Sequence, residues 1–82
     1  SLAHARVCVV GCGKTGERAA RQLAKLGARD LVLLNRTPGR AERLAQALGG
    51  RAAPWAALHA ELAMADVAVV ATSASAPVVL AA

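Results

Sequence analysis

The stretch Arg6-Val-Cys-Val-Val-Gly-Cys-Gly-Lys-Thr-Gly16 decides how this 82-residue chain begins to fold. Residues 6–10 form an apolar run rich in β-branched side chains, which predicts a strand buried on both faces, as in a parallel sheet. The run ends abruptly in three glycines with the spacing G-x-G-x-x-G. From residue 17 to 26 the apolar positions follow a helical period, with charged residues on the opposite face. The segment therefore predicts a strand, a glycine turn and a helix.

The rest of the chain continues this alternation of strands and helices. Thr37 and Pro38 are typical of the N-cap and first position of a helix, and Gly49-Gly50 is typical of a helix end. Short crossovers of this kind favour right-handed parallel connections. The sequence predicts an α/β, Rossmann-like doubly wound parallel sheet, βαβαβαβ, with three αβα layers in one domain. The further expected elements are a strand at 31–34, a helix at 38–48, a strand at 51–53, a helix at 55–64 and a strand at 66–71.

The glycine spacing has a specific physical meaning when it lies between a strand and a helix. Gly11 allows the tight turn off the strand, Gly13 lets the backbone approach a pyrophosphate, and Gly16 lets the helix pack close to the sheet. The free N–H groups and the dipole at the start of the helix then bind phosphates. We therefore expect a dinucleotide site at this turn, with Lys14 and Thr15 beside the cofactor phosphates.

An overlapping motif offers a second interpretation of the same turn. Gly13-Lys14-Thr15 matches the end of the pattern G-x-x-x-x-G-K-[ST], which binds the phosphates of ATP or GTP. That pattern needs a glycine five positions before Gly13, where this chain has Cys8. The dinucleotide interpretation is therefore favoured, and Lys14 lies either near the cofactor phosphates or in solvent.

The residues after the second expected strand indicate which dinucleotide is bound, because NAD-binding domains usually have Asp or Glu there to bond the ribose 2′-hydroxyl. This chain has Asn35-Arg36-Thr37 instead, and Arg40 lies one helical turn further on. Arg36 can pair with a 2′-phosphate and stack on adenine, and Arg40 can add charge. Asn35 and Thr37 can donate hydrogen bonds to the same phosphate. We therefore expect NADPH; the alternative is that Thr37 only caps the helix and both arginines are solvated.

Two small polar residues after the fourth expected strand extend the predicted site. In sheets of this kind the ligand lies beyond the carboxyl ends of the strands, so Thr72 and Ser73 can border the nicotinamide ribose. Equally, Ser73 or Ser75 can cap a helix ahead of Pro77, and the sequence does not decide between the two. No residue is assigned a catalytic role, and no metal site is expected.

The composition limits the classes of function. The net charge of +5 suggests anionic partners, but no run of five basic residues occurs and no aromatic platforms interleave with the charges, so direct nucleic-acid binding is disfavoured. Cys8 and Cys12 have neither a CxxC nor a zinc spacing, and we expect two buried small side chains and not a disulfide. The basic residues expected on solvated helix faces are Arg18, Arg21, Lys25 and Arg43.

The two ends of the chain suggest a piece of a larger enzyme. It begins at Ser1 and stops in an apolar stretch, so residues 1–82 are expected to supply a cofactor-binding domain without complete catalytic machinery. No signal peptide is visible, and polar residues interrupt the apolar run from residue 67, so no membrane span is expected. A cytoplasmic location is the default expectation.

Three segments together resemble the NADPH-binding domain of glutamyl-tRNA reductase, and the likeness covers nearly the whole chain. Shikimate dehydrogenase shares the Asn-Arg-Thr element, but it usually has a GAGGA-like glycine loop and Asn-Ala-Thr after the later strand. Gly16 and Ala71-Thr72-Ser73 fit the reductase better. One departure is Lys14-Thr15, where the reductase family often has Glu-Met. The three segments are V-x-V-V-G-x-G-x-x-G from Val7, Asn35-Arg36-Thr37 with Ala41 and Leu44-Ala45 behind it, and Ala65-Asp66-Val67 leading to Thr72-Ser73-Ala74 and Pro77-Val78.

The resemblance implies an NADP-dependent oxidoreductase that reduces glutamyl-tRNA to glutamate-1-semialdehyde, the first committed step of tetrapyrrole (porphyrin) synthesis from glutamate. In that family a cysteine in a separate N-terminal domain attacks the aminoacyl ester, and NADPH delivers hydride to the resulting thioester. Neither Cys8 nor Cys12 corresponds to that cysteine. The regions that bind the aminoacyl-tRNA and form a homodimer are expected outside residues 1–82.

Two alternatives to the reductase stay open. The first is the cofactor domain of a shikimate- or quinate-type dehydrogenase, whose other domain binds a small hydroxy acid and not tRNA. The second is a non-enzymatic module that senses dinucleotides. Such modules more often need the ribose-binding carboxylate, so Asn35-Arg36 argues against the second alternative.

Overall fold

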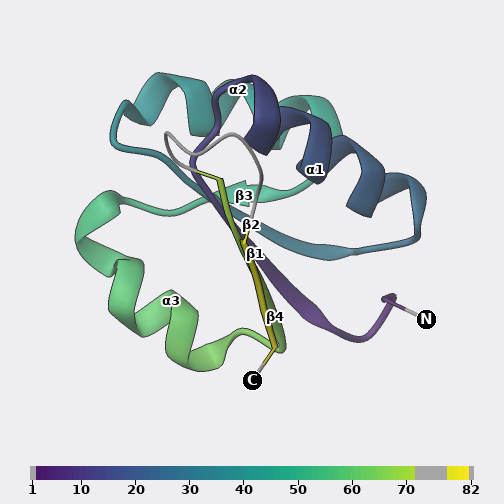
Figure 1. The fold of residues 1–82 in the computed structure, drawn as a ribbon. Coiled ribbons are helices and arrows are strands. Elements are labelled where there is room, and N and C mark those ends of the chain that lie inside the picture. The colour runs from purple at the N-terminus through teal and green to yellow at the C-terminus, as the bar shows by residue number, and fades with distance from the viewer. Residues whose placement is uncertain (1, 72–77, 82) are drawn as a thin grey trace.

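Five strands form one sheet with helices on both faces in the computed structural model of the chain (Figure 1). The structure describes residues 2–71 and 78–81. The strand order in the sheet is β3-β2-β1-β4-β5. In chain order the elements are β1 (Arg6–Val10), α1 (Lys14–Lys25), β2 (Asp30–Leu34), α2 (Pro38–Leu48), β3 (Arg51–Ala52), the 3-10 turn η1 (Trp55–Ala57), α3 (Leu58–Met64), β4 (Val67–Val70) and β5 (Val78–Ala81).

The strands β1 to β4 pair in parallel, as the sequence predicts. β1 is central, and Cys8 lies opposite Val32 of β2 on one side and Ala68 of β4 on the other. The chain builds outward from β1 through β2 to β3, and then returns past β1 to form β4. The strand order therefore reverses between β1 and β4. The predicted Rossmann-like, doubly wound α/β fold is confirmed.

The strand β5 is an addition to the four strands that the sequence predicts. It pairs antiparallel with β4, with Val78 opposite Val70 and Ala81 opposite Val67. The sequence predicts no strand in the apolar run after Pro77. Pairing with β5 satisfies the outer N–H and C=O groups of β4, which would otherwise form an exposed sheet edge.

Helix boundaries differ from the prediction where the helical period carries no signal. α1 begins at Lys14, ahead of the predicted start at residue 17, because its N-cap Gly13 belongs to the glycine turn itself. The segment predicted as a helix over 55–64 begins with a 3-10 turn and is α-helical only from Leu58.

No helix in the described part of the chain is long and apolar enough to cross a membrane. The basic residues predicted on solvated helix faces are exposed, namely Arg18, Arg21, Lys25 and Arg43.

Alternate strand residues pack against helices on opposite faces, which produces the three predicted layers (Figure 1). One core cluster joins the sheet to α1 and α2, and the other joins it to α3. Cys8 belongs to the second cluster and Cys12 to the first, and both thiols are buried and free, as predicted. The β1 and β2 residues of the first cluster are Val7, Val9, Leu31 and Leu33, and those of the second are Cys8, Val10, Val32 and Leu34.

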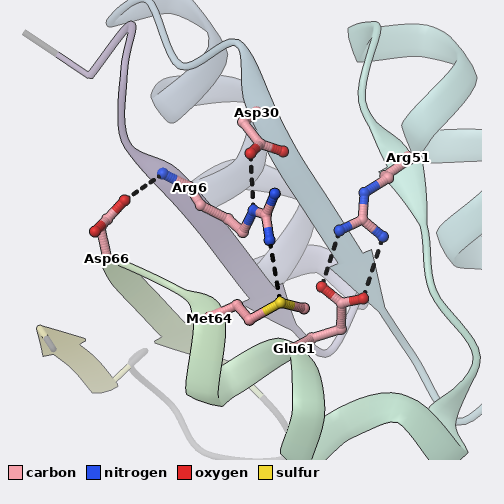
Figure 2. A network of polar contacts seen from close by, with 6 residues as sticks. All are labelled: Arg6, Asp30, Arg51, Glu61, Met64 and Asp66. Atoms are coloured by element: carbon pink, nitrogen blue, oxygen red, sulfur yellow. Dashed lines mark hydrogen bonds and ion pairs between the residues drawn. The ribbon is translucent and has the colours of Figure 1, made fainter.

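A polar network lies at the amino ends of the strands, at the edge of the sheet opposite the glycine turn (Figure 2). The Arg6 side chain donates through Nε to Asp30 Oδ2 at 2.8 Å, and its backbone N–H donates to Asp66 Oδ2 at 2.8 Å. Arg51 donates two hydrogen bonds to the Glu61 carboxylate, at 2.9 and 3.2 Å. This pair links α3 to the start of β3, and its carboxylate partner is buried, since Glu61 is only 8% exposed.

Candidate functional site

A pocket of about 530 Å³ lies at the carboxyl edge of the parallel strands. The segment after each of these strands contributes to it: Gly11 after β1, Asn35 after β2, Trp55 after β3 and Ala71 after β4. The pocket thus lies where the strand order reverses, which is where open α/β sheets bind their ligands. The other residues that line it are Gly13, Arg36, Thr37 and Arg40.

The three glycines of the turn lie in different surroundings. Gly11 has a φ of 95°, a backbone conformation that residues other than glycine rarely adopt. A Cβ at Gly16 would lie 1.7 Å from the Gly11 carbonyl oxygen, so the helix packs directly against the turn. A Cβ at Gly13 would meet no described atom within 4 Å, and the φ of −74° there is ordinary. The fold thus requires glycine at 11 and 16, whereas nothing described in the fold requires it at 13.

The N-terminus of α1 provides free hydrogen-bond donors at the edge of the pocket. Its N-cap is Gly13, which lines the pocket, and no side chain in the described part of the chain makes a capping hydrogen bond to the helix. The first N–H groups of an α-helix have no partner within the helix, and the positive end of the helix dipole lies there. The acidic residue in the first turn, Glu17, is ion-paired with Arg21 at 2.9 Å. This end of the helix therefore suits an anionic ligand.

Asn35 joins the glycine turn to the start of α2. Its Oδ1 accepts a hydrogen bond from the backbone N–H of Cys12 at 3.0 Å, and its Nδ2 donates to the carbonyl oxygen of Thr37 at 3.1 Å. The sequence predicts Asn35 as a phosphate donor, but these bonds leave only one N–H of its amide for a ligand. Thr37 is the N-cap residue of α2, although its side chain makes no capping hydrogen bond.

The pocket carries positive charge. Arg36 and Arg40 are exposed and line it, and no carboxylate is among its lining residues within the described chain. Ion pairs among the described residues engage other arginines, so neither Arg36 nor Arg40 has an acidic partner there. Two guanidinium groups without acidic partners, beside a helix N-terminus, favour a ligand with phosphate groups.

Trp55 is a pocket residue that sequence reasoning missed. Its ring centroid lies 5.4 Å from the guanidinium carbon of Arg36, within the range of a cation–π contact. The sequence predicts Trp55 only at the start of a connecting helix. The signal for a further role was present, because the one aromatic residue of the chain closely follows the third expected strand, at the sheet edge where ligands bind.

Three predicted residues that the structure describes, Lys14, Thr15 and Gly16, do not line this pocket. Lys14 is exposed at the first position of α1 and lines a neighbouring pocket of about 470 Å³, which shares Gly13 and Arg40 with the first. Thr15 is half-buried and lines neither of these two pockets. The predicted residues Thr72 and Ser73 lie outside the described residues.

Burial keeps the two thiols of the chain protonated. It raises the pKa of Cys8 to about 11, with a further upward effect of the Glu61 carboxylate and an opposing effect of Arg51. Burial also raises the pKa of Cys12, against the guanidinium charge of Arg40. Because the thiolate is the reactive form of cysteine, neither side chain is prepared for nucleophilic attack near neutral pH.

Comparison with protein families identifies the group to which the chain belongs. The family described as shikimate/quinate 5-dehydrogenase matches residues 1–82, which include every residue of the pocket. The chain belongs to this family.

Several relatives of the chain are glutamyl-tRNA reductases. The reductase of Myxococcus xanthus is 49% identical over 76 residues, which are 93% of this chain and 17% of that protein. That of Salinibacter ruber is 43% identical over 77 residues, 94% of this chain and 16% of that protein. Among solved structures, glutamyl-tRNA reductase from Methanopyrus kandleri matches with a TM-score of 0.81 and 43% identity, over 90% of this chain and 18% of that chain.

These matches confirm the resemblance to glutamyl-tRNA reductase that the motifs indicate. The chain spans only 16–17% of the length of the two curated relatives. The likeness to these reductases therefore concerns one segment of each, the segment that corresponds to the glycine turn and the pocket of this chain.

Proposed function

We propose that the chain binds NADPH and serves as the cofactor-binding domain of an NADP-dependent oxidoreductase. The observation that carries this proposal is the pair Arg36 and Arg40, which line the pocket without acidic partners among the described residues. They follow β2, where a domain that binds NAD usually has a carboxylate. Guanidinium groups attract the 2′-phosphate of NADPH, which a carboxylate at this position would repel.

The described residues fit a dinucleotide in two places. The pyrophosphate would lie against Gly13 and the free N–H groups of α1, where no Cβ intervenes. The 2′-phosphate would lie beside Arg36 and Arg40, with the Thr37 hydroxyl as a further donor. No described contact requires glycine at position 13. Close approach of a ligand would explain why glycine stands there, which supports this arrangement. The residues proposed at the other phosphates and at the nicotinamide ribose are Lys14, Thr15, Thr72 and Ser73.

The whole protein is proposed to reduce glutamyl-tRNA, as the names of the curated relatives suggest. When bound, NADPH supplies the hydride for such a reduction. The part of this chain is to bind and orient the cofactor, and we assign no residue of it to chemistry on the substrate. Contact with the aminoacyl-tRNA is proposed for other parts of the protein.

A domain exchange tests this function. The chain would replace the matching segment of the Myxococcus xanthus reductase, to which it is 49% identical, and NADPH-dependent reduction of glutamyl-tRNA would be measured. We expect the chimera to reduce glutamyl-tRNA, and the chimera with Arg36→Ala to need about tenfold more NADPH for half its maximal rate. A chimera that binds NADPH but does not reduce glutamyl-tRNA would contradict the reductase assignment and leave the cofactor assignment intact.

A further inference from the structure

The fold holds Trp55 in place from the side of the core. Trp55 is half-buried and packs against the core cluster on the α3 face of the sheet. It is the first residue of η1, a turn closed by the hydrogen bond from the Ala57 N–H to the Pro54 carbonyl oxygen at 2.9 Å. The position of the ring is therefore set by the packed part of the domain and not by the ligand.

Among the described residues, the Trp55 ring is the contact that holds the Arg36 side chain. Its guanidinium carbon lies 5.4 Å from the Trp55 ring centroid, and among the described residues it has no hydrogen bond or ion pair from its side chain. An exposed arginine samples many rotamers, so ordering it on ligand binding costs conformational entropy. A contact that orders the side chain before the ligand arrives reduces that cost.

The shape of the guanidinium group determines what such a contact leaves free. The group is planar, with two faces and an edge of N–H donors that can bond a phosphate through two atoms. A ring that contacts the group on one side, as Trp55 does, leaves N–H donors on the other sides for a ligand. We propose that Trp55 is a positioning residue that makes the pocket selective for 2′-phosphorylated adenine nucleotides, because it holds Arg36 ready for the phosphate. This inference rests on the proposed binding of NADPH.

Other roles for Trp55 would give different binding results. If the ring contacted adenine directly, its removal would weaken NADPH and NADH alike, because both contain adenine. If the ring served only to fill the core, its removal would lower the thermal stability and leave the affinities of the folded variant unchanged. The preference between the two cofactors therefore separates positioning from both other roles.

Calorimetric titration with NADPH and NADH tests the proposal. We expect Trp55→Leu, which keeps an apolar side chain toward the core, to weaken NADPH binding about fivefold and to change NADH binding less than about twofold. Trp55→Phe keeps a ring and is expected to retain most of the preference. In a chain that already carries Arg36→Ala, Trp55→Leu is expected to have no further effect on NADPH, because the side chain that it positions is gone.

Three results would overturn the inference: an equal loss of NADH and NADPH binding in Trp55→Leu, no loss of either, or the full loss in the Arg36→Ala background. If the unsubstituted chain does not prefer NADPH, the proposed function fails and the inference fails with it. If the unsubstituted chain prefers NADPH and Trp55→Leu keeps that preference, only the inference fails.

Fluorescence gives a second readout that needs no variant. Trp55 is the only aromatic residue of the chain, which has no Tyr or Phe, so the intrinsic emission reports on this ring alone. We expect adenosine 2′,5′-bisphosphate to shift the emission more at saturation than adenosine 5′-monophosphate does. Equal shifts with the two nucleotides would show that the ring does not sense the 2′-phosphate, and would contradict the proposal.

Discussion

The glycine turn permits a sharp prediction, because Gly16 and Gly13 belong to one motif but lie in different surroundings. The Cβ of Gly16→Ala would lie 1.7 Å from the Gly11 carbonyl oxygen and 2.7 Å from its carbon. These are backbone atoms, so α1 would have to move away from the turn. Overpacking of this kind costs about 1 to 3 kcal/mol, and a contact this short belongs at the upper end. Alanine regains about 1 kcal/mol over glycine within a helix, which leaves a net loss of about 2 kcal/mol.

Gly13→Ala is the matched control within the same motif. Its Cβ would meet no described atom within 4 Å, and the φ of −74° suits alanine. Alanine restricts the unfolded chain, which contributes about 0.4 to 1 kcal/mol, but it is a poorer N-cap than glycine, so we expect the free energy of unfolding to change by about 1 kcal/mol or less. The new methyl group would occupy the space proposed for the pyrophosphate, so we expect the affinity for NADPH to fall about tenfold or more.

Thermal unfolding and NADPH titration of both variants provide the assay. For a domain of this size, a loss of 2 kcal/mol lowers the Tm by roughly 8 to 16 °C, so Gly16→Ala is expected to melt lower by that amount. Gly13→Ala is expected to melt close to the unsubstituted chain and well above Gly16→Ala, while it binds NADPH poorly. The reasoning is refuted if Gly16→Ala keeps its Tm, or if Gly13→Ala either loses stability to the same extent or binds NADPH normally.

Two further predictions concern stability. Arg51→Met leaves Glu61, which is 8% exposed, without its partner, and should lower the free energy of unfolding in urea by about 2 kcal/mol. The control is Arg21→Met at the exposed pair with Glu17, which should cost about 0.5 kcal/mol or less. Equal losses would contradict the role of the buried pair. The Cys8 thiol has a pKa of about 11 in the fold against 9.0 as its ordinary value, so it contributes stability that is complete below pH 9 and is lost as the pH rises through 11. Urea unfolding across this range should show a fall of about 2 to 3 kcal/mol that Cys8→Ala reduces, and an identical fall in Cys8→Ala would rule the thiol out as its cause.

Sequence alone predicts the elements whose side chains repeat with the period of a strand or helix. β1 is predicted with its observed bounds, Arg6–Val10, because a strand buried on both faces is apolar at every position. The start of α1 is missed because its first residues belong to the glycine turn and have no apolar face. β5 is missed because an antiparallel edge strand depends on where the chain returns to the sheet, which no local period records.

The candidate site follows the same division. Gly11, Gly13 and Arg36 are predicted for the site from the sequence, because dinucleotide-binding folds have fixed spacings between the glycine turn and the end of the second strand, and all three line the pocket. Trp55 could not be placed beside Arg36, because the two side chains come from different strand ends and meet only when the sheet is assembled. For the same reason the Cys12–Asn35 hydrogen bond, which joins two loops, could not be predicted.

The most direct test of the central claim is calorimetric titration of the chain with NADPH and with NADH, repeated with Arg36→Ala. The account predicts that NADPH binds at least about tenfold more tightly than NADH, and that Arg36→Ala loses about 1.4 kcal/mol or more of that preference. If a folded chain binds both cofactors equally well, or if Arg36→Ala leaves the preference intact, the segment after β2 is not a 2′-phosphate site and the assignment of NADPH is wrong.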